Sequence, residues 1–170
     1  GMGYHDAKDL IKWLEYIISK DKEAEILIHG VSMGAATVMI ASSLDNLPQN
    51  VKVIIEDCGY TTALEQFKYQ LKKLFNMPSF PILNIANLMV KIKSGYFLND
   101  ASPIEAVKEA KVPIMFIHGD DDKFVPFYML DELYEACSSE KQKLVIHGAS
   151  HAHSEDENPE KYWKEVDAFI

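Results

Sequence analysis

The chain has 170 residues, enough for one domain with a sizeable hydrophobic core, and 48% of them are apolar, as in a globular protein. A formal net charge of −9 argues against a nucleic-acid-binding protein, and no apolar run reaches the roughly 18 residues of a membrane span. With no visible signal peptide and only two isolated cysteines, Cys58 and Cys137, we expect free thiols and a cytoplasmic protein without a nucleic-acid or membrane partner.

Apolar patterns predict an alternation of helices and strands. In chain order they predict a helix at 5–19, a strand at 26–29, a helix at 33–44, a strand at 51–56, helices at 62–75, 83–93 and 104–110, a strand at 112–119, a helix opened by Pro126 and running to 137, a strand at 143–148, and a last helix begun by Asn158-Pro159. This order predicts a single α/β domain, a parallel sheet between two layers of helices. Residues 60–109 are too long for a plain crossover and predict a helical cap or insertion.

A serine stands between two glycines after the first predicted strand, in Gly30-Val31-Ser32-Met33-Gly34. A strand, a sharp turn and a helix in this order are typical of a nucleophile elbow. Side chains at positions 30 and 34 are expected to collide with the neighbouring elements, and Ser32 is expected to adopt a strained backbone that exposes its hydroxyl. The N–H of Met33, at the helix start, would then point to the position of a developing oxyanion.

A nucleophilic serine needs a base and an acid that orients the base. Three aspartates follow the third predicted strand, and three histidines follow the fourth: Asp120, Asp121, Asp122, His147, His151 and His153. Because parallel strands place their carboxyl ends at one edge of the sheet, these groups can meet Ser32 there. A metal site within the aspartate run is a remote alternative, since calcium loops need more widely spread ligands and a glycine. Residues 153–157, HSEDE, are expected to form a solvated acidic loop.

Three motifs together resemble the α/β-hydrolase superfamily, in its serine-hydrolase branch of bacterial esterase- and peptidase-like proteins. They are the glycine-flanked Ser32 turn, HGDDDKFVP at 118–126 and GASHA at 148–152; EDCGYTT, YFLNDASPIEAV and NPEKYWKEVDAFI are also similar. The resemblance implies a serine hydrolase, a carboxylesterase or peptidase-like enzyme that cleaves an ester or amide of a small molecule without a cofactor or metal. It places the nucleophile on Ser32, the acid on Asp122, the base on His151 and one oxyanion donor on Met33. Asp120 or Asp121 as the acid and His153 as the base stay open.

The resemblance also implies that part of the fold is missing. The family's sheet usually has eight strands with the nucleophile after the fifth, whereas only 31 residues precede Ser32, and before the strand at 26–29 they hold one helix and no strand. We therefore expect the C-terminal half of the fold, with about four strands and without the loop that supplies the second oxyanion N–H. Loss of one such donor costs about 100- to 1000-fold in rate, so we expect impaired activity. The strand at 26–29 would become an exposed edge, and such edges favour a homo-oligomer, for instance an antiparallel pair.

Two functions other than a hydrolase are compatible with an α/β domain. A non-catalytic remnant that serves as a binding or assembly module stays open. A dinucleotide-binding protein is disfavoured, because Gly-x-Gly-x-x-Gly is absent and Glu56 is the nearest acidic residue to the required position. For a hydrolase, apolar residues of the 60–109 segment suit an apolar substrate pocket, although core packing is the expected role of most: Phe67, Phe75, Phe80, Ile82, Leu83 and Leu88.

Overall fold

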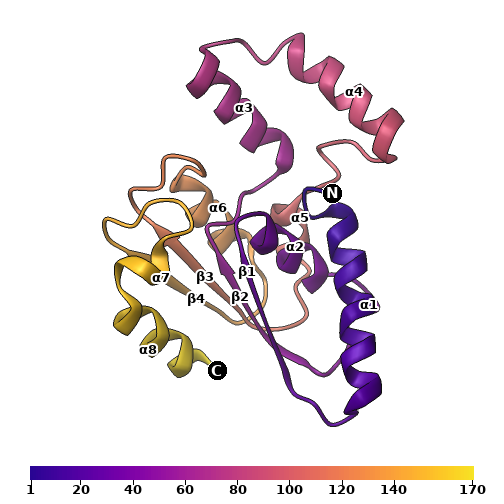
Figure 1. The fold of residues 1–170 in the computed structure, drawn as a ribbon, viewed down its shortest axis with the longest axis vertical. Helices are drawn as coiled ribbons and strands as arrows, with labels where there is room; N and C mark the ends of the chain where they lie inside the picture. The colour runs from indigo at the N-terminus through magenta and orange to yellow at the C-terminus, as the bar shows by residue number, and fades with distance from the viewer.

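Four parallel strands form one sheet in the computed structural model, which describes all 170 residues (Figure 1). The strands are β1 (Ile26–Val31), β2 (Val51–Asp57), β3 (Ile114–Gly119) and β4 (Lys141–Ile146), and their order across the sheet is the order of the chain. Every pairing is parallel, so all four strands end at the same edge. The predicted α/β architecture is confirmed, and so is the position of the first strand at an edge of the sheet.

Helices cover the two faces of the sheet unequally. One face packs against α1 (Tyr4–Lys20), α2 (Met33–Ser42), α5 (Pro103–Val107) and α6 (Tyr128–Ala136), and the other against α8 (Pro159–Phe169). Both faces of β3 are covered, and all six of its residues are buried. At the edge, β1 leaves the side chains of Leu27, His29 and Val31 exposed, because the apolar contacts of α8 are with β2, β3 and β4.

Two further helices stand beyond the carboxyl edge of the sheet. They are α3 (Ala63–Phe75) and α4 (Ile82–Ser94), joined by a short turn into a hairpin that projects from the rest of the molecule (Figure 1). The Thr62 hydroxyl caps the start of α3 by accepting a hydrogen bond from the N–H of Glu65. Asn76 and Gly95 end the two helices in left-handed conformations, as helix C-termini commonly do. We call residues 62–95 the hairpin.

Several boundaries differ from the sequence prediction. β4 begins at Lys141 and ends at Ile146, two residues earlier than expected, because Gly148 adopts a left-handed turn conformation with φ of 82°. Pro126 lies in a turn, and α6 begins only at Tyr128. The acidic stretch after His153 is not a plain loop but forms the short helix α7 (Ser154–Glu157). The expected cap of the last helix is confirmed, since the Asn158 side chain accepts a hydrogen bond from the N–H of Lys161.

None of the helices combines the length and the apolar character that a membrane crossing needs.

Candidate active site

Ser32 lies on a strained turn between β1 and α2. Its φ of 55° and ψ of −112° lie in a region that side chains rarely occupy, and its N–H is held by the carbonyl of Asp57 at 2.8 Å. A Cβ at Gly30 would meet the carbonyl oxygen of Gly34 at 2.4 Å, so position 30 requires glycine. The expectation of a second collision at Gly34 is wrong, because a Cβ there would point into open space.

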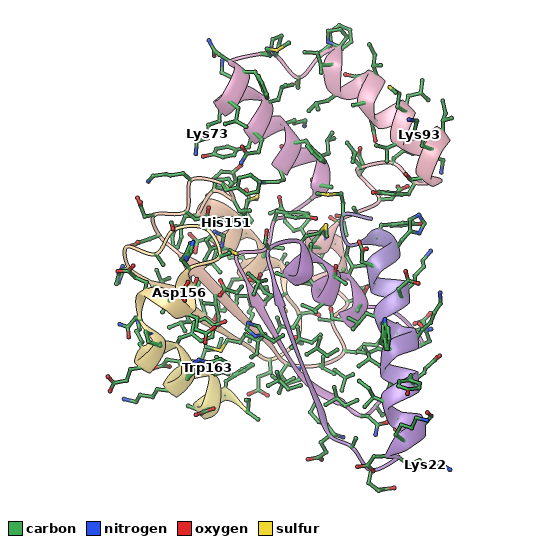
Figure 2. The ribbon with its side chains drawn as sticks, viewed as in Figure 1. Lys22, Lys73, Lys93, His151, Asp156 and Trp163 are labelled. Carbon is green, nitrogen blue, oxygen red and sulfur yellow. The ribbon has the colours of Figure 1, made fainter.

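Two hydrogen bonds connect Ser32 to a histidine and an aspartate from distant parts of the chain. Ser32 Oγ lies 2.9 Å from His151 Nε2, and His151 Nδ1 lies 2.7 Å from Asp122 Oδ2. Asp122 follows β3 and His151 follows β4, so the common carboxyl edge of the sheet brings the three side chains together. Figure 2 shows His151 at this edge, below the hairpin. The three residues that the motifs indicate are therefore joined by hydrogen bonds, Ser32 to His151 and His151 to Asp122.

Asp122 is held as a carboxylate by its surroundings. Its Oδ1 accepts hydrogen bonds from the N–H groups of Phe124 at 2.7 Å and Val125 at 2.9 Å. Burial by itself would raise the pKa of Asp122, but hydrogen bonds from His118 and His151 outweigh burial and lower the pKa below its usual range. An ionised Asp122 favours the His151 tautomer that carries its proton on Nδ1, which leaves Nε2 free to accept the Ser32 proton.

The other candidates for acid and base have separate partners. Asp120 Oδ2 lies 2.7 Å from His147 Nδ1, and its Oδ1 accepts the N–H of Gly148. Asp121 pairs with Lys123 at 2.6 Å. His153 Nδ1 lies 2.8 Å from the carboxylate of Asp156. None of these groups hydrogen-bonds to Ser32 or His151, and the three aspartates do not converge on a common metal position.

Sequence reasoning missed two residues beside the acid. His118, near the end of β3, is fully buried with its Nε2 3.3 Å from Asp122 Oδ2 and 3.1 Å from the carbonyl of Val125. The thiol of Cys58, which follows β2 with φ of 51°, lies within 4.8 Å of ligand atoms of Asp122 and His151. The one signal in the sequence is their position, since each lies at the carboxyl end of a strand.

Met33 is the first residue of α2, so its N–H belongs to the first turn of a helix, where backbone donors have no intrahelical acceptor. This location fits the oxyanion donor expected from the sequence. The Met33 side chain remains about half exposed and lines the cavity beside Ser32.

An apolar cavity of about 510 Å³ opens between Ser32 and the hairpin. Nine of its twelve lining residues are hydrophobic and none is charged: Met2, Ser32, Met33, Tyr60, Gln66, Phe67, Gln70, Leu71, Leu74, Phe75, Leu83 and Phe124. Of the six residues expected to form a pocket, Phe67, Phe75 and Leu83 line it. Phe80, Ile82 and Leu88 do not; Phe80 lies in the connection before α4, and the side chains of Phe80 and Leu88 are exposed.

A second, polar cavity of about 400 Å³ borders His151. His151, His153, Lys73, Lys123 and Asp121 contribute to its lining, and it shares Gln70, Leu74 and Phe124 with the apolar cavity. A group bonded to the reacting carbon near Ser32 can therefore extend into either an apolar or a charged space.

Comparisons with known proteins identify the family of the chain. The sequence profile of the prolyl oligopeptidase family matches residues 1–170. The protein YqkD of Bacillus subtilis (strain 168) is 30% identical over 169 residues, 99% of this chain and 55% of YqkD, so the chain spans about half the length of this curated relative.

Solved structures share the fold at low sequence identity. A puromycin-hydrolyzing peptidase from Mycobacterium tuberculosis is similar with a TM-score of 0.72 and 17% identity, over 98% of this chain and 25% of that chain. The esterase Pf2001 from Pyrococcus furiosus is similar with a TM-score of 0.70 and 16% identity, over 99% and 62%.

Proposed function

The chain belongs to the prolyl oligopeptidase family of α/β-hydrolases, and we propose that it is a serine hydrolase that cleaves an ester or amide bond through Ser32, His151 and Asp122. The observation that carries the proposal is the continuous hydrogen-bonded path from Ser32 Oγ through His151 to the buried carboxylate of Asp122. In the proposed reaction Ser32 Oγ attacks the carbonyl carbon while His151 Nε2 takes its proton. Asp122 stabilises the imidazolium that results.

The remaining steps use the same residues. The N–H of Met33 donates a hydrogen bond to the oxyanion of the tetrahedral intermediate. His151 returns its proton to the leaving group, and an acyl-enzyme on Ser32 remains. A water molecule, deprotonated by His151, then releases the acid and regenerates the serine. None of these steps calls for a cofactor, and the uncharged cavity beside Ser32 suits an apolar acyl group.

Covalent labelling tests the proposal directly. A fluorophosphonate probe should form one adduct on Ser32, and Ser32→Ala should lose both the adduct and the hydrolysis of a p-nitrophenyl ester by at least about 1000-fold. Ser150→Ala, which removes an exposed hydroxyl from the histidine loop, is the matched control and should retain both. A folded protein that forms no adduct would instead support the binding or assembly module that the sequence left open.

A further inference from the structure

Exposed apolar side chains are concentrated on the hairpin. Of the 20 large hydrophobic residues that remain exposed in the chain, eight lie between positions 74 and 92: Leu74, Phe75, Met77, Phe80, Ile85, Leu88, Met89 and Ile92. Phe80 and Ile92 are 72% and 75% exposed. Scattered exposed hydrophobic residues are ordinary in a soluble protein, but a cluster of this kind marks an interaction surface.

The outward face of α4 is an apolar stripe. Successive residues of a helix are about 100° apart, so Ile85, Leu88, Met89 and Ile92 share one face. All four are more than half exposed, whereas Leu83, on the opposite face, is buried in the hairpin. The solvent side of an ordinary surface helix is polar. α4 thus has one apolar face that packs within the protein and a second one, which we call the outer stripe, that has no partner in the chain.

The hairpin also differs in charge from the rest of the molecule. Residues 62–95 contain five lysines and one glutamate, a net charge of +4, whereas the whole chain carries −9 and the remainder therefore −13. Lys91 and Lys93 lie about 100° to either side of Ile92 and so flank the outer stripe on both sides. Long lysine side chains in such positions can reach anionic head groups while the apolar face is buried.

From these observations we propose that the outer stripe and its flanking lysines dock the protein on an anionic lipid bilayer. The hairpin projects from the body, and Figure 2 shows Lys73 and Lys93 on its two sides, well separated from the acidic α7–α8 region that contains Asp156. A second copy is a poorer occupant of the stripe, because two hairpins of charge +4 would repel each other. The lack of an apolar run long enough to span a membrane predicted no membrane partner, but interfacial docking requires no spanning segment.

The hairpin that carries the stripe also borders the apolar cavity that leads to Ser32. Leu74, Phe75 and Leu83 of the hairpin line that cavity, so apolar surface continues from the outside of the hairpin to the candidate nucleophile. A lipid-borne acyl chain could therefore pass from the bilayer to Ser32. This last step rests on the proposed hydrolase function, whereas the docking itself does not.

Vesicle co-sedimentation tests the docking. The Ser32→Ala chain, which cannot turn over lipid, should sediment with phosphatidylglycerol-containing vesicles at low salt and remain in solution with pure phosphatidylcholine vesicles. Lys91→Gln with Lys93→Gln should lower the partition coefficient by about 30-fold, and molar salt should have a similar effect. Leu88→Ser with Ile92→Ser should lower it by at least about tenfold, because both side chains are exposed and their loss removes only contact with lipid.

Matched controls on α1 distinguish binding through the outer stripe from nonspecific adsorption to vesicles. Trp13→Ser with Ile17→Ser removes apolar side chains that are about as exposed as Leu88 and Ile92. Lys8→Gln with Lys20→Gln removes the same charge as the Lys91 and Lys93 substitutions. Neither pair should change binding to the vesicles. Equal binding of the stripe variant and its parent, or no binding to anionic vesicles, would overturn the proposal. So would a dimer in sedimentation velocity that the stripe variant dissociates, because a second copy would then occupy the stripe. Because these assays use Ser32→Ala protein, their failure leaves the proposed hydrolase untouched.

Discussion

Asp122 receives hydrogen bonds from two backbone N–H groups and two histidine rings, more than any other carboxylate near Ser32. Asp122→Asn should leave the fold intact but place an amide against His151 Nδ1 and favour the wrong tautomer. We expect kcat for an activated ester to fall by about 10⁴-fold. The control is Asp120→Asn, since Asp120 holds His147 and the following turn rather than the base. If Asp120→Asn caused the larger loss, the acid would be wrongly assigned.

Glu56 is fully buried beneath the elbow, and one of its carboxyl oxygens has no hydrogen-bond partner. Burial, with the nearby charge of Asp57, raises the pKa of Glu56 well above its usual range, although the N–H of Gly59 opposes this. The folded protein therefore keeps Glu56 neutral at a pH where the unfolded chain ionises it. Above about pH 4.3, the free energy of unfolding should lose up to about 1.4 kcal/mol per pH unit through this group, until the raised pKa is reached.

Glu56→Gln removes this pH dependence. Relative to the parent, the variant should become more stable as pH rises from 4 to 8, as measured by urea unfolding at each pH, whereas below pH 4 the difference should be constant. Glu65→Gln, at an exposed position on α3, is the control, and its free energy of unfolding should change with pH as that of the parent does. Parallel stability curves for Glu56→Gln and its parent would show that Glu56 is ionised in the folded protein.

At the scale of elements, α3 is connected to the loop that carries the acid. The side-chain amides of Gln66 and Gln70 both donate to the carbonyl of Phe124, and Lys73 donates to that of Lys123. The ring of Phe124 lies 4.8 Å from that of His151. α3 therefore fixes the loop on which the position of Asp122 and His151 depends.

Replacing both glutamines by leucine should loosen this loop without emptying the cavity they line. For Gln66→Leu with Gln70→Leu we expect kcat to fall by about tenfold, because two hydrogen bonds that position the acid loop are lost. KM for an apolar ester should change little, and Lys68→Leu on the same helix, where the lysine contacts Glu65, should behave like the parent. A raised KM with unchanged kcat would mean that the glutamines contact substrate instead of positioning the loop.

At the scale of the whole molecule, the sheet ends abruptly at β1. Its outer edge has no neighbouring strand, and Leu27 and Val31 remain 38% and 41% exposed beside it. An apolar edge of this kind favours pairing with a second chain. We expect a homo-oligomer formed by antiparallel pairing of two β1 strands, and Leu27→Lys with Val31→Lys should shift it to monomer in sedimentation velocity. Ile17→Lys on α1 is the control. A parent that stays monomeric at high concentration would contradict the expectation.

Much of this architecture follows from local sequence. Apolar runs broken by glycine and proline predict the parallel strands, because a strand buried on both faces must be apolar throughout. The glycine at position 30 predicts the elbow, since the crossing of backbones there leaves no room for a side chain. Parallel topology then requires that residues following β3 and β4 meet Ser32 at one edge, which is why the chain order of serine, aspartate and histidine is informative.

The tertiary structure alone decided which side chains converge and which surfaces stay uncovered. Strand order does not distinguish the three neighbouring aspartates, although the family motif favours Asp122, and loop geometry turns only Asp122 toward His151 while Asp120 and Asp121 bind other partners. The helical period of α4 predicts where its apolar residues lie around the axis, but only the packing of Leu83 shows which face is buried and leaves the outer stripe free. Such choices depend on contacts between residues that are distant in the chain.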